Sequence, residues 1–329
     1  MPDVPLSLAI SYYDHVSDLV RGRVRAEGIS LTSIELPHEE IFFRMVSFSE
    51  WDVAEFSMAK YVSLAGAGDP PFRAIPVFPS RVFRQSAIYV ATRAGIANPG
   101  DLAGRSVGVP EWAQTAGIYA RAYLQHQCGV RLRDIHWIQA GVNEPGRDEK
   151  VRLLMPDGVE IERIRDRSLT EMLQTGELDA IISARPPDAF IAGDKRIAPL
   201  WADPRSIEEE YYRKTNIFPI MHVIVIKSAT LDRYPWIAMN LFKAFQDAKK
   251  NSLDRLANPV ISRMPFAWAP EAVLAAQSLF GTDCWPYGVE SNRPTLEAFL
   301  QYSWEQGLTE RNVQVDQLFP RELSKFVRV

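Results

Sequence analysis

Two arginines in a largely apolar stretch are the first residues of this sequence whose placement suggests chemistry. Arg81 and Arg84 are three residues apart, and most of their neighbours between Phe78 and Ile88 are apolar. A guanidinium in such surroundings needs a paired anion, which either the protein or a ligand can supply. Composition alone favours a structural salt bridge, and an anionic ligand is the alternative.

Two further polar residues could take part in a site, although each also has a simpler structural role. His222 directly precedes the apolar run Val223–Ile226, and a lone histidine in that position is more often a core residue with its hydrogen bonds satisfied. Thr115 is expected to be the N-cap of a helix, although the free N–H groups there can also bind an anion. Neither residue decides the function alone.

Known cofactor motifs are not found. The sequence contains no GxGxxG, GxxxxGK[ST], HExxH or EF-hand pattern, so nucleotide and zinc-protease functions lose their sequence support. His38, Glu39 and Glu40 are sequence neighbours, which do not converge on one metal ion without help, so they are interpreted as a solvated helix start. The run 208–210 of three glutamates is interpreted as a charged helix face.

The elements that must position these residues alternate between strands and helices. Leu6, Leu8 and Ile10 alternate with small or polar residues, which is the period of a strand. The other expected strands are Trp51–Glu55, Ile75–Phe78, Ala87–Ala91, Ser106–Val109, Leu178–Ser183 and Val223–Ile226. Helices are expected after Ser57, from Thr115, over Leu169–Gln174, around Glu208–Tyr212, from Pro235 and through most of the C-terminal region.

This alternation predicts an α/β fold with largely parallel sheets. In such sheets ligands bind just beyond the carboxyl ends of the strands. The polar residues of the sequence fall at these expected ends, so the pattern predicts a cleft there, lined by Asp14 and His15, Glu55 and Ser57, Glu111 and Thr115, and Ser183 and Arg185.

Composition narrows the class of protein. The chain has 329 residues, 47% of them hydrophobic and 24% charged, which is typical of a folded soluble protein and predicts two domains. The net charge of −4, without long runs of one sign, gives no electrostatic basis for binding nucleic acid or acidic lipid. No apolar run approaches the roughly 18 residues of a membrane span. A small-molecule partner is therefore expected.

A cytoplasmic location is also expected. Residues Met1–Pro5 include an acid and two prolines, where an export signal would have a basic stretch and an apolar run. Cys128 and Cys284 are far apart and form no CxxC motif, which fits a reducing compartment. Both cysteines are interpreted as small apolar residues of the core.

Taken together, several segments resemble the 4,5-dihydroxyphthalate decarboxylase family over essentially the whole chain. The strings IFPIMH and PSRxFR are long and unusual, whereas GELDA alone would be weak. Two departures, Gln85 where members often have histidine and Asn216 where they have glycine, leave room for a related aromatic acid as the substrate. The matching segments are Ile75–Arg84, Thr115-Ala116, Gly176–Ala180, Ile217–His222, Tyr287-Gly288 and Asn292-Arg293.

The resemblance implies a type II periplasmic-binding-protein-like fold, with two α/β lobes and a ligand cleft between them. We expect lobe I to comprise residues 1–90 and 223–329, including the helical C-terminal region, and lobe II to comprise residues 91–222. Transport receptors that do no chemistry share this fold, so the fold does not establish catalysis. The family assignment favours an enzyme, a carboxy-lyase.

The implied reaction, a step in phthalate degradation, is the non-oxidative conversion of 4,5-dihydroxyphthalate to 3,4-dihydroxybenzoate (protocatechuate) and CO₂. Loss of CO₂ from an aryl carboxylate would leave a costly aryl anion unless the ring carbon is protonated first. The hydroxyl para to that carbon supplies electrons for this protonation. The site then needs a proton donor, an anion clamp and an acceptor for the hydroxyl hydrogen.

The resemblance assigns the anion clamp to basic residues and to a helix N-terminus. Arg81 and Arg84 would bind the carboxylates through charge-assisted hydrogen bonds, with Arg185 or Arg293 assisting. Thr115 would bind substrate at the start of its helix.

The proton chemistry falls to different residues. His222 is the expected general acid, because an imidazolium exists near neutral pH and a nearby dianion favours it; His15 is the reserve. Glu55, with Asp14, would accept the hydrogen of a ring hydroxyl. No sequence feature requires an organic cofactor, and a divalent ion bridging the hydroxyl oxygens is conceivable, although no convincing ligand set for it is found.

Two other functions stay open at this point. The first is a non-catalytic substrate-binding protein for an aromatic acid, such as the receptor of a transporter. The second is a non-catalytic sensory or structural protein with the same cleft. The C-terminal tryptophans could form an interface between copies of the chain or could simply pack in the core; they are Trp268, Trp285 and Trp304.

Overall fold

The chain forms two compact units, each built on its own β-sheet. The computed structural model describes residues 2–68, 70–261 and 263–324. Unit 1 comprises residues 1–81, 222–297 and 314–329, and unit 2 comprises residues 82–221 and 298–313. These boundaries differ from the expected ones near Val90 and Val223, because the strand Ile88–Ala91 pairs in the sheet of unit 2 and residues 298–313 also belong to that unit.

The sheet of unit 1 has five strands in the order β2-β1-β3-β11-β4. β1 pairs in parallel with β2 and β3, whereas β11 is antiparallel to both β3 and β4. Every residue of β3 is buried, the polar residues Glu55 and Ser57 included, so the strand is covered on both faces. The strands are β1 (Val4–Ile10), β2 (Ile29–Glu35), β3 (Val53–Ser57), β4 (Phe72–Ile75) and β11 (His222–Lys227).

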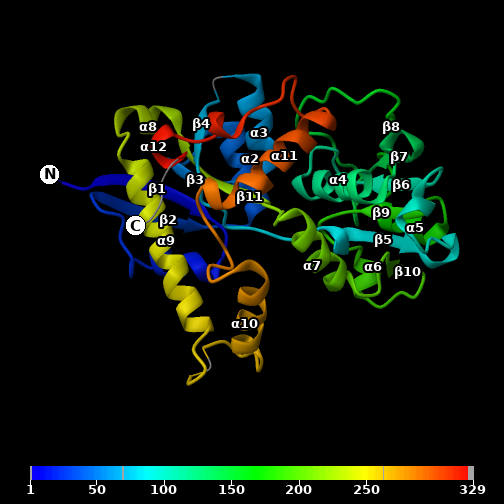
Figure 1. The fold of residues 1–329 in the computed structure, drawn as a ribbon. Helices are drawn as coiled ribbons and strands as arrows, with labels where there is room; N and C mark the ends of the chain where they lie inside the picture. The colour runs from blue at the N-terminus through cyan, green and yellow to red at the C-terminus, as the bar shows by residue number, and fades with distance from the viewer. Residues whose placement is uncertain (1, 69, 262, 325–329) are drawn as a thin grey trace. The chain divides into compact units, whose positions relative to one another are not determined.

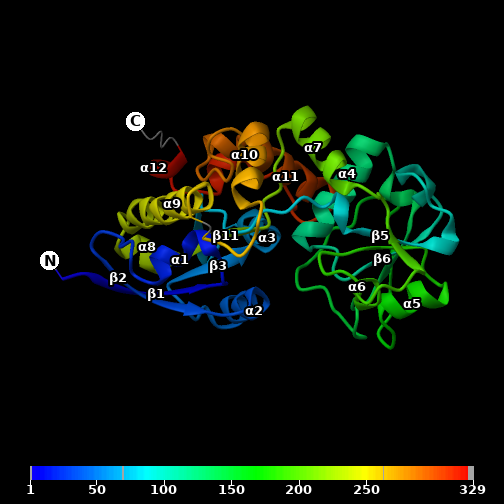
Figure 2. The same ribbon diagram turned by 90° about the horizontal axis from the view of Figure 1, so that it is seen from below.

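Helices cover both faces of this sheet. α9 (Ile237–Leu256) and α2 (His38–Phe48) lie on opposite sides of β1 and β3 (Figure 2). α9 has no internal glycine or proline, and Ile237, Leu241 and Phe245 place its apolar face in the core. Burying each such side chain contributes about 1.5–3 kcal/mol. The unit also contains α1 (Ser17–Val20), α3 (Met58–Ala67), α8 (Ser228–Arg233), α10 (Ala269–Phe280) and α12 (Arg321–Ser324).

The sheet of unit 2 has six strands in the order β10-β5-β9-β6-β7-β8 (Figure 1). The pairs from β9 through β6 and β7 to β8 are parallel, and β5 is antiparallel to β9 and to β10. The strands are β5 (Ile88–Ala91), β6 (Ser106–Val109), β7 (His136–Gln139), β8 (Ile161–Arg163), β9 (Ala180–Ile182) and β10 (Ile197–Pro199).

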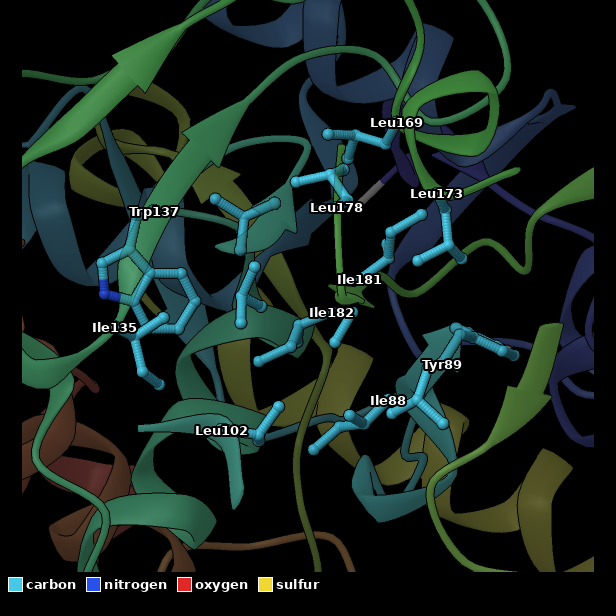
Figure 3. Close-up of a cluster of buried hydrophobic side chains, with 14 of the residues drawn as sticks. Ile88, Tyr89, Leu102, Ile135, Trp137, Leu169, Leu173, Leu178, Ile181 and Ile182 are labelled. Atoms are coloured by element: carbon cyan, nitrogen blue, oxygen red, sulfur yellow. The ribbon is translucent and has the colours of Figure 1, made fainter. Parts of the chain in front are cut away.

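One hydrophobic core holds unit 2 together. Side chains from β5, β7, β9 and α5 (Leu169–Thr175) converge on it (Figure 3), and Ile88, Trp137 and Leu169 each have at most 1% of their surface exposed. The other helices are α4 (Thr115–Cys128), α6 (Asp188–Ile191), α7 (Pro204–Thr215) and the last two-thirds of α11 (Arg293–Glu305), whose first five residues belong to unit 1.

Two expectations about the elements are wrong. Both sheets are mixed rather than largely parallel, because β5 and β11 run against their neighbours, and strand direction is not encoded in local periodicity. The strand expected at Ile75–Phe78 instead spans Phe72–Ile75. Within the described ranges, no helix combines the length and the apolar character needed to cross a bilayer.

The three C-terminal tryptophans differ in their surroundings. Trp285 is half-buried, and its indole N–H donates to the carbonyl oxygen of Phe78. Trp268 and Trp304 are 66% and 48% exposed. Of the three, only Trp268 and Trp304 offer much of their surface to an interface.

Candidate active site

A buried carboxylate and an imidazole meet where β3 pairs with β11. The strands are antiparallel, with Glu55 opposite Ile224 and Ser57 opposite His222. Opposed residues point to the same face, so Glu55 and His222 are diagonal neighbours on one face of the sheet. Nδ1 of His222 lies 2.6 Å from Oε1 of Glu55. The structure therefore joins two of the predicted catalytic residues.

Glu55 is held by three hydrogen-bond donors. Besides His222, the backbone N–H of Ser11 donates to Oε2 at 2.8 Å and the Tyr13 hydroxyl donates to Oε1 at 2.5 Å. Burial acts to raise the pKa of Glu55, but the bonds from His222, Tyr13 and Ser11 outweigh it and hold the pKa below its ordinary value. Glu55 is therefore ionised near neutral pH, and Nδ1 of His222 carries the hydrogen between them.

This environment differs from the sequence interpretation of Glu55. The polar residues were expected just beyond the end of a strand, but β3 continues to Ser57, so Glu55 lies inside the strand with no exposed side-chain surface. Tyr13 adds a neutral donor, because burial and the Glu55 anion raise the pKa of its phenol. Its hydroxyl also lies 3.2 Å from Nδ1 of His222.

The His222 ring reaches the edge of the buried cluster. Its side chain is 16% exposed, and the edge of Phe42 packs against it with ring centroids 4.9 Å apart. The His38 ring lies 5.3 Å away at a tilt of 33°. Nδ1 is committed to Glu55, and Nε2 makes no hydrogen bond to the described residues. Nε2 is therefore the ring atom available for proton exchange.

His15 is neutral near pH 7. Burial lowers its pKa to about 4 despite the opposing effect of Asp14, so His15 is poorly suited to be an acid at neutral pH. It hydrogen-bonds the Pro79 backbone, while its buried Nε2 has no partner among the described residues. Asp14 is exposed and accepts a hydrogen bond of 2.6 Å from Ser252 of α9.

Arg81 belongs to the same unit and is buried, with 4% of its surface exposed. Its guanidinium donates to the side-chain oxygen of Asn292 and, at 3.2 Å, to the carbonyl oxygen of Pro286. Lys249 adds a second buried cation, which donates to Asp283 at 2.5 Å and has its pKa lowered by burial. Unit 1 thus contains two buried cations, Arg81 and Lys249, each of which donates hydrogen bonds to groups of the same unit.

Arg293 lies outside this cluster. It forms ion pairs with Glu290, Glu297 and Asp316 at 2.6, 3.6 and 3.5 Å, and its side chain is 34% exposed. The residue that precedes it, Asn292, is the one that contacts Arg81. Of the predicted pair Asn292-Arg293, the buried residue is therefore Asn292 and not the arginine.

Three other predicted residues belong to unit 2. Arg84 contacts the sulfur of Met221 at 3.1 Å, and burial lowers its pKa to about 10, so it stays charged. The expected salt bridge is wrong for Arg84, whose contact among the described residues is the Met221 sulfur; Glu208 interacts with it through charge without forming an ion pair. Thr115 is the buried first residue of α4, and Gln114, not Thr115, is its N-cap. Arg185 is exposed and makes no ion pair or hydrogen bond with described residues.

Several residues of the cluster were missed, although some left a signal. Lys249 lies four residues after Phe245, on the apolar face of α9, which marks it as a buried cation. Tyr13 could not be identified from the sequence, because the adjacent residue Tyr12 is also a tyrosine. Only the structure shows that Tyr12 is 72% exposed whereas Tyr13 contacts Glu55. His38 was interpreted as solvated, and its proximity to His222 depends on a long-range contact.

Two other site types find little support. Residues 104–108, Gly-Arg-Ser-Val-Gly, fit the GxSxG pattern, but Ser106 is the first residue of β6 rather than part of a strand-to-helix turn. Among the residues that the structure describes, no three His, Cys, Asp or Glu side chains are grouped to hold a metal ion.

Comparison with known proteins finds a full-length relative. A Comamonas testosteroni protein named 4,5-dihydroxyphthalate decarboxylase is 34% identical over 328 residues, which cover 99% of each chain. A Pseudomonas putida protein of the same name is 36% identical over 214 residues, covering 65% of this chain and 83% of the relative. No family model matches the sequence.

Solved structures confirm the expected two-lobed fold. The aliphatic sulphonate binding protein SsuA of Escherichia coli has a TM-score of 0.55 at 15% identity and covers 98% of this chain and 99% of its own. The desulfurization enzyme DSZB has a TM-score of 0.52 at 15% identity and covers 96% of each chain. Binding proteins and an enzyme share this fold, so the fold does not decide the activity.

Proposed function

Because the chain belongs to the 4,5-dihydroxyphthalate decarboxylase family, we propose that it converts 4,5-dihydroxyphthalate to 3,4-dihydroxybenzoate and CO₂. Full-length similarity to a relative with that name supports the substrate and the reaction. The buried Glu55–His222 pair, with Nδ1 and Oε1 2.6 Å apart, carries the proposal that the site does chemistry. This pair fixes a proton donor in one orientation, which is what the reaction requires.

In the proposed step, imidazolium Nε2 of His222 gives its proton to the ring carbon that bears the leaving carboxylate. The para hydroxyl supplies the electron pair that forms this C–H bond. The C–CO₂ bond then breaks, its electron pair returns to the ring and restores aromaticity, and CO₂ leaves. His222 ends neutral, with its remaining hydrogen on Nδ1 still donated to Glu55.

Glu55 acts in this account as a positioning residue for His222. Its three donors occupy both carboxylate oxygens, so it has little capacity left to accept the hydrogen of a ring hydroxyl. The carboxylate fixes the orientation of the ring and stabilises the imidazolium. Neutral His15, whose buried Nε2 has no partner among the described residues, is the better acceptor for a ring hydroxyl hydrogen.

The carboxylates of the substrate require cations. In unit 1 we assign this role to Arg81, held by Asn292, in place of Arg293, whose guanidinium is engaged by three carboxylates. In unit 2 Arg84, Arg185 and Thr115 keep their proposed role in binding the anionic substrate. Arg84 supports this because it is a partly buried cation that forms no ion pair with the described residues.

A cytoplasmic location belongs to the same proposal. The two cysteines, Cys128 and Cys284, are both free, as expected in a reducing compartment. Fractionation of the source cells with a specific antibody tests the location.

The direct test is to incubate the purified protein with 4,5-dihydroxyphthalate and to follow CO₂ and 3,4-dihydroxybenzoate. The reaction is run in D₂O, and the product is analysed by NMR. The proposal predicts both products, with deuterium at the ring position that lost the carboxylate. Saturable binding of the substrate without product would instead make the protein a receptor for an aromatic acid.

A further inference from the structure

The His38 ring lies beside His222 at the exposed edge of the cluster. His38 is the first residue of α2, is exposed to solvent, and has its ring centroid 5.3 Å from that of His222. Phe42, one turn later on α2, packs edge-on against His222 with centroids 4.9 Å apart. One helix therefore supplies both an apolar wall and a second imidazole to the His222 ring.

The proposed reaction consumes one proton in each turnover. The carboxylate leaves as neutral CO₂ and its place on the ring is taken by hydrogen, so His222 must be reprotonated before the next cycle. Because Nδ1 keeps its hydrogen in the bond to Glu55, the new proton has to arrive at Nε2. Because only 16% of the His222 side chain is exposed, a group that reaches both solvent and the imidazole would speed this transfer.

The other groups packed around His222 cannot supply this proton. Glu55 is an ionised carboxylate with no exposed surface. Tyr13 is a neutral phenol whose hydroxyl donates to Glu55. Phe42 has no exchangeable proton, and Lys60 packs over Phe42 rather than over His222, with its Nζ 5.8 Å from the Phe42 ring centroid.

We propose that His38 is the proton-relay residue of this site and carries protons from solvent to Nε2 of His222. The inference rests on the proposed function. His38 takes a proton from water and passes it to neutral His222, either directly or through one bridging water, and is itself left neutral. Each transfer moves one proton and leaves the electron count of both rings unchanged.

The test compares His38→Gln with His136→Gln, which removes an exposed histidine from unit 2. The turnover number kcat is measured over a series of buffer concentrations, with and without added imidazole. In His38→Gln we expect kcat to fall about tenfold at low buffer concentration and KM to change little. This loss is smaller than the roughly 10²-fold loss in kcat expected when His222, the acid, is replaced. Imidazole should restore kcat, and His136→Gln should behave as the unmodified protein.

Two results would overturn the relay. One is an unchanged kcat of His38→Gln at low buffer. The other is a lowered kcat that neither buffer nor imidazole restores, in a variant with an unchanged melting temperature, because a role in packing or substrate binding would give that pattern. No turnover by the unmodified protein would instead overturn the proposed function itself.

Discussion

The proposed chemistry of this protein centres on what three hydrogen bonds do to one buried carboxylate. An isolated carboxylate in the core would be protonated or would destabilise the fold. The donors Ser11, Tyr13 and His222 keep Glu55 charged, and Glu55 in turn fixes the imidazole. Because the anion is built into the sheet, the proton donor is oriented before substrate binds.

Replacing Glu55 with glutamine tests this positioning role. An amide removes the charge that stabilises the imidazolium, so we expect kcat to fall by at least about tenfold. The alkaline limb of the kcat–pH profile of Glu55→Gln should move to lower pH, because the His222 imidazolium then loses its proton more easily. Steady-state kinetics across pH measure both effects.

Asp18→Asn is the matched control for that variant. Asp18 is also a buried carboxylate of unit 1 with a lowered pKa, and it pairs with Arg255 rather than with His222. Its replacement should lower stability without moving the pH profile. A profile that stays in place in Glu55→Gln as well would argue against Glu55 as the partner of the acid.

His15 makes the stability of the protein depend on pH. Its folded-state pKa is about 4, whereas a histidine in the unfolded chain titrates near about 6.5. Between these values the unfolded state binds more protons, so the free energy of unfolding falls as the pH falls, by up to about 3 kcal/mol. Above about pH 6.5, where His15 is neutral in both the folded and the unfolded state, the full free energy of unfolding is retained.

Denaturant titrations across this pH window test the contribution of His15. In His15→Asn the slope of the unfolding free energy against pH should be reduced. An identical slope in His15→Asn would mean that His15 titrates freely in the folded protein.

The sequence indicated most residue types of the site but not their pairing. His222, Glu55 and Arg81 were identified because polar groups in apolar surroundings need partners. Their partners could not be identified, since Glu55 and His222 are 167 residues apart in the chain. The proposed roles of Asn292 and His38 likewise follow only from their contacts with Arg81 and His222, which are distant in the sequence.

Two strands were predicted well because apolar residues dominate their sequences. Ser106–Val109 and the buried run before Lys227 were located within one residue. β2 was not predicted, because it exposes polar residues on both faces, and of α2 only the start at His38 was predicted, because most of this helix is exposed. The antiparallel direction of β11, which makes Glu55 and His222 diagonal neighbours, is a property of the folded sheet.

Two glycines with nearly the same backbone geometry allow a test of how the segment 298–313 packs in unit 2. Gly307 and Gly193 have φ of +77° and +81°. A Cβ at Gly307 would overlap the carbonyl oxygen of Leu154, whereas a Cβ at Gly193 would meet no atom within 4 Å. The Leu154 N–H also donates to the Gly307 carbonyl oxygen at 2.8 Å.

Alanine at these two positions should therefore have unequal effects. Gly193→Ala should cost about 1 kcal/mol of unfolding free energy, from the left-handed backbone alone. Gly307→Ala should cost more than about 3 kcal/mol, because a backbone oxygen cannot move aside cheaply. Chemical denaturation measures both, and equal losses would contradict the packing of Gly307 against Leu154.

The molecule as a whole shows why the fold could be anticipated and the activity could not be derived from it. Two mixed sheets with helices on their faces are shared with sulphonate binding proteins and with a desulfurization enzyme. These chains are about 15% identical to this one, so what they share is the backbone framework. In our proposal, the carboxylate–imidazole pair on one sheet is what adds chemistry to this framework.

The measurement that tests the account most directly is the turnover of 4,5-dihydroxyphthalate by the unmodified protein and by His222→Asn, with substrate binding measured in parallel. Asparagine keeps a polar side chain beside Glu55 but cannot transfer a proton. We predict that His222→Asn binds the substrate with similar affinity and that its kcat is lower by roughly 10² or more. Near-normal turnover by His222→Asn would contradict the account, because the ring carbon would then receive its proton from another group.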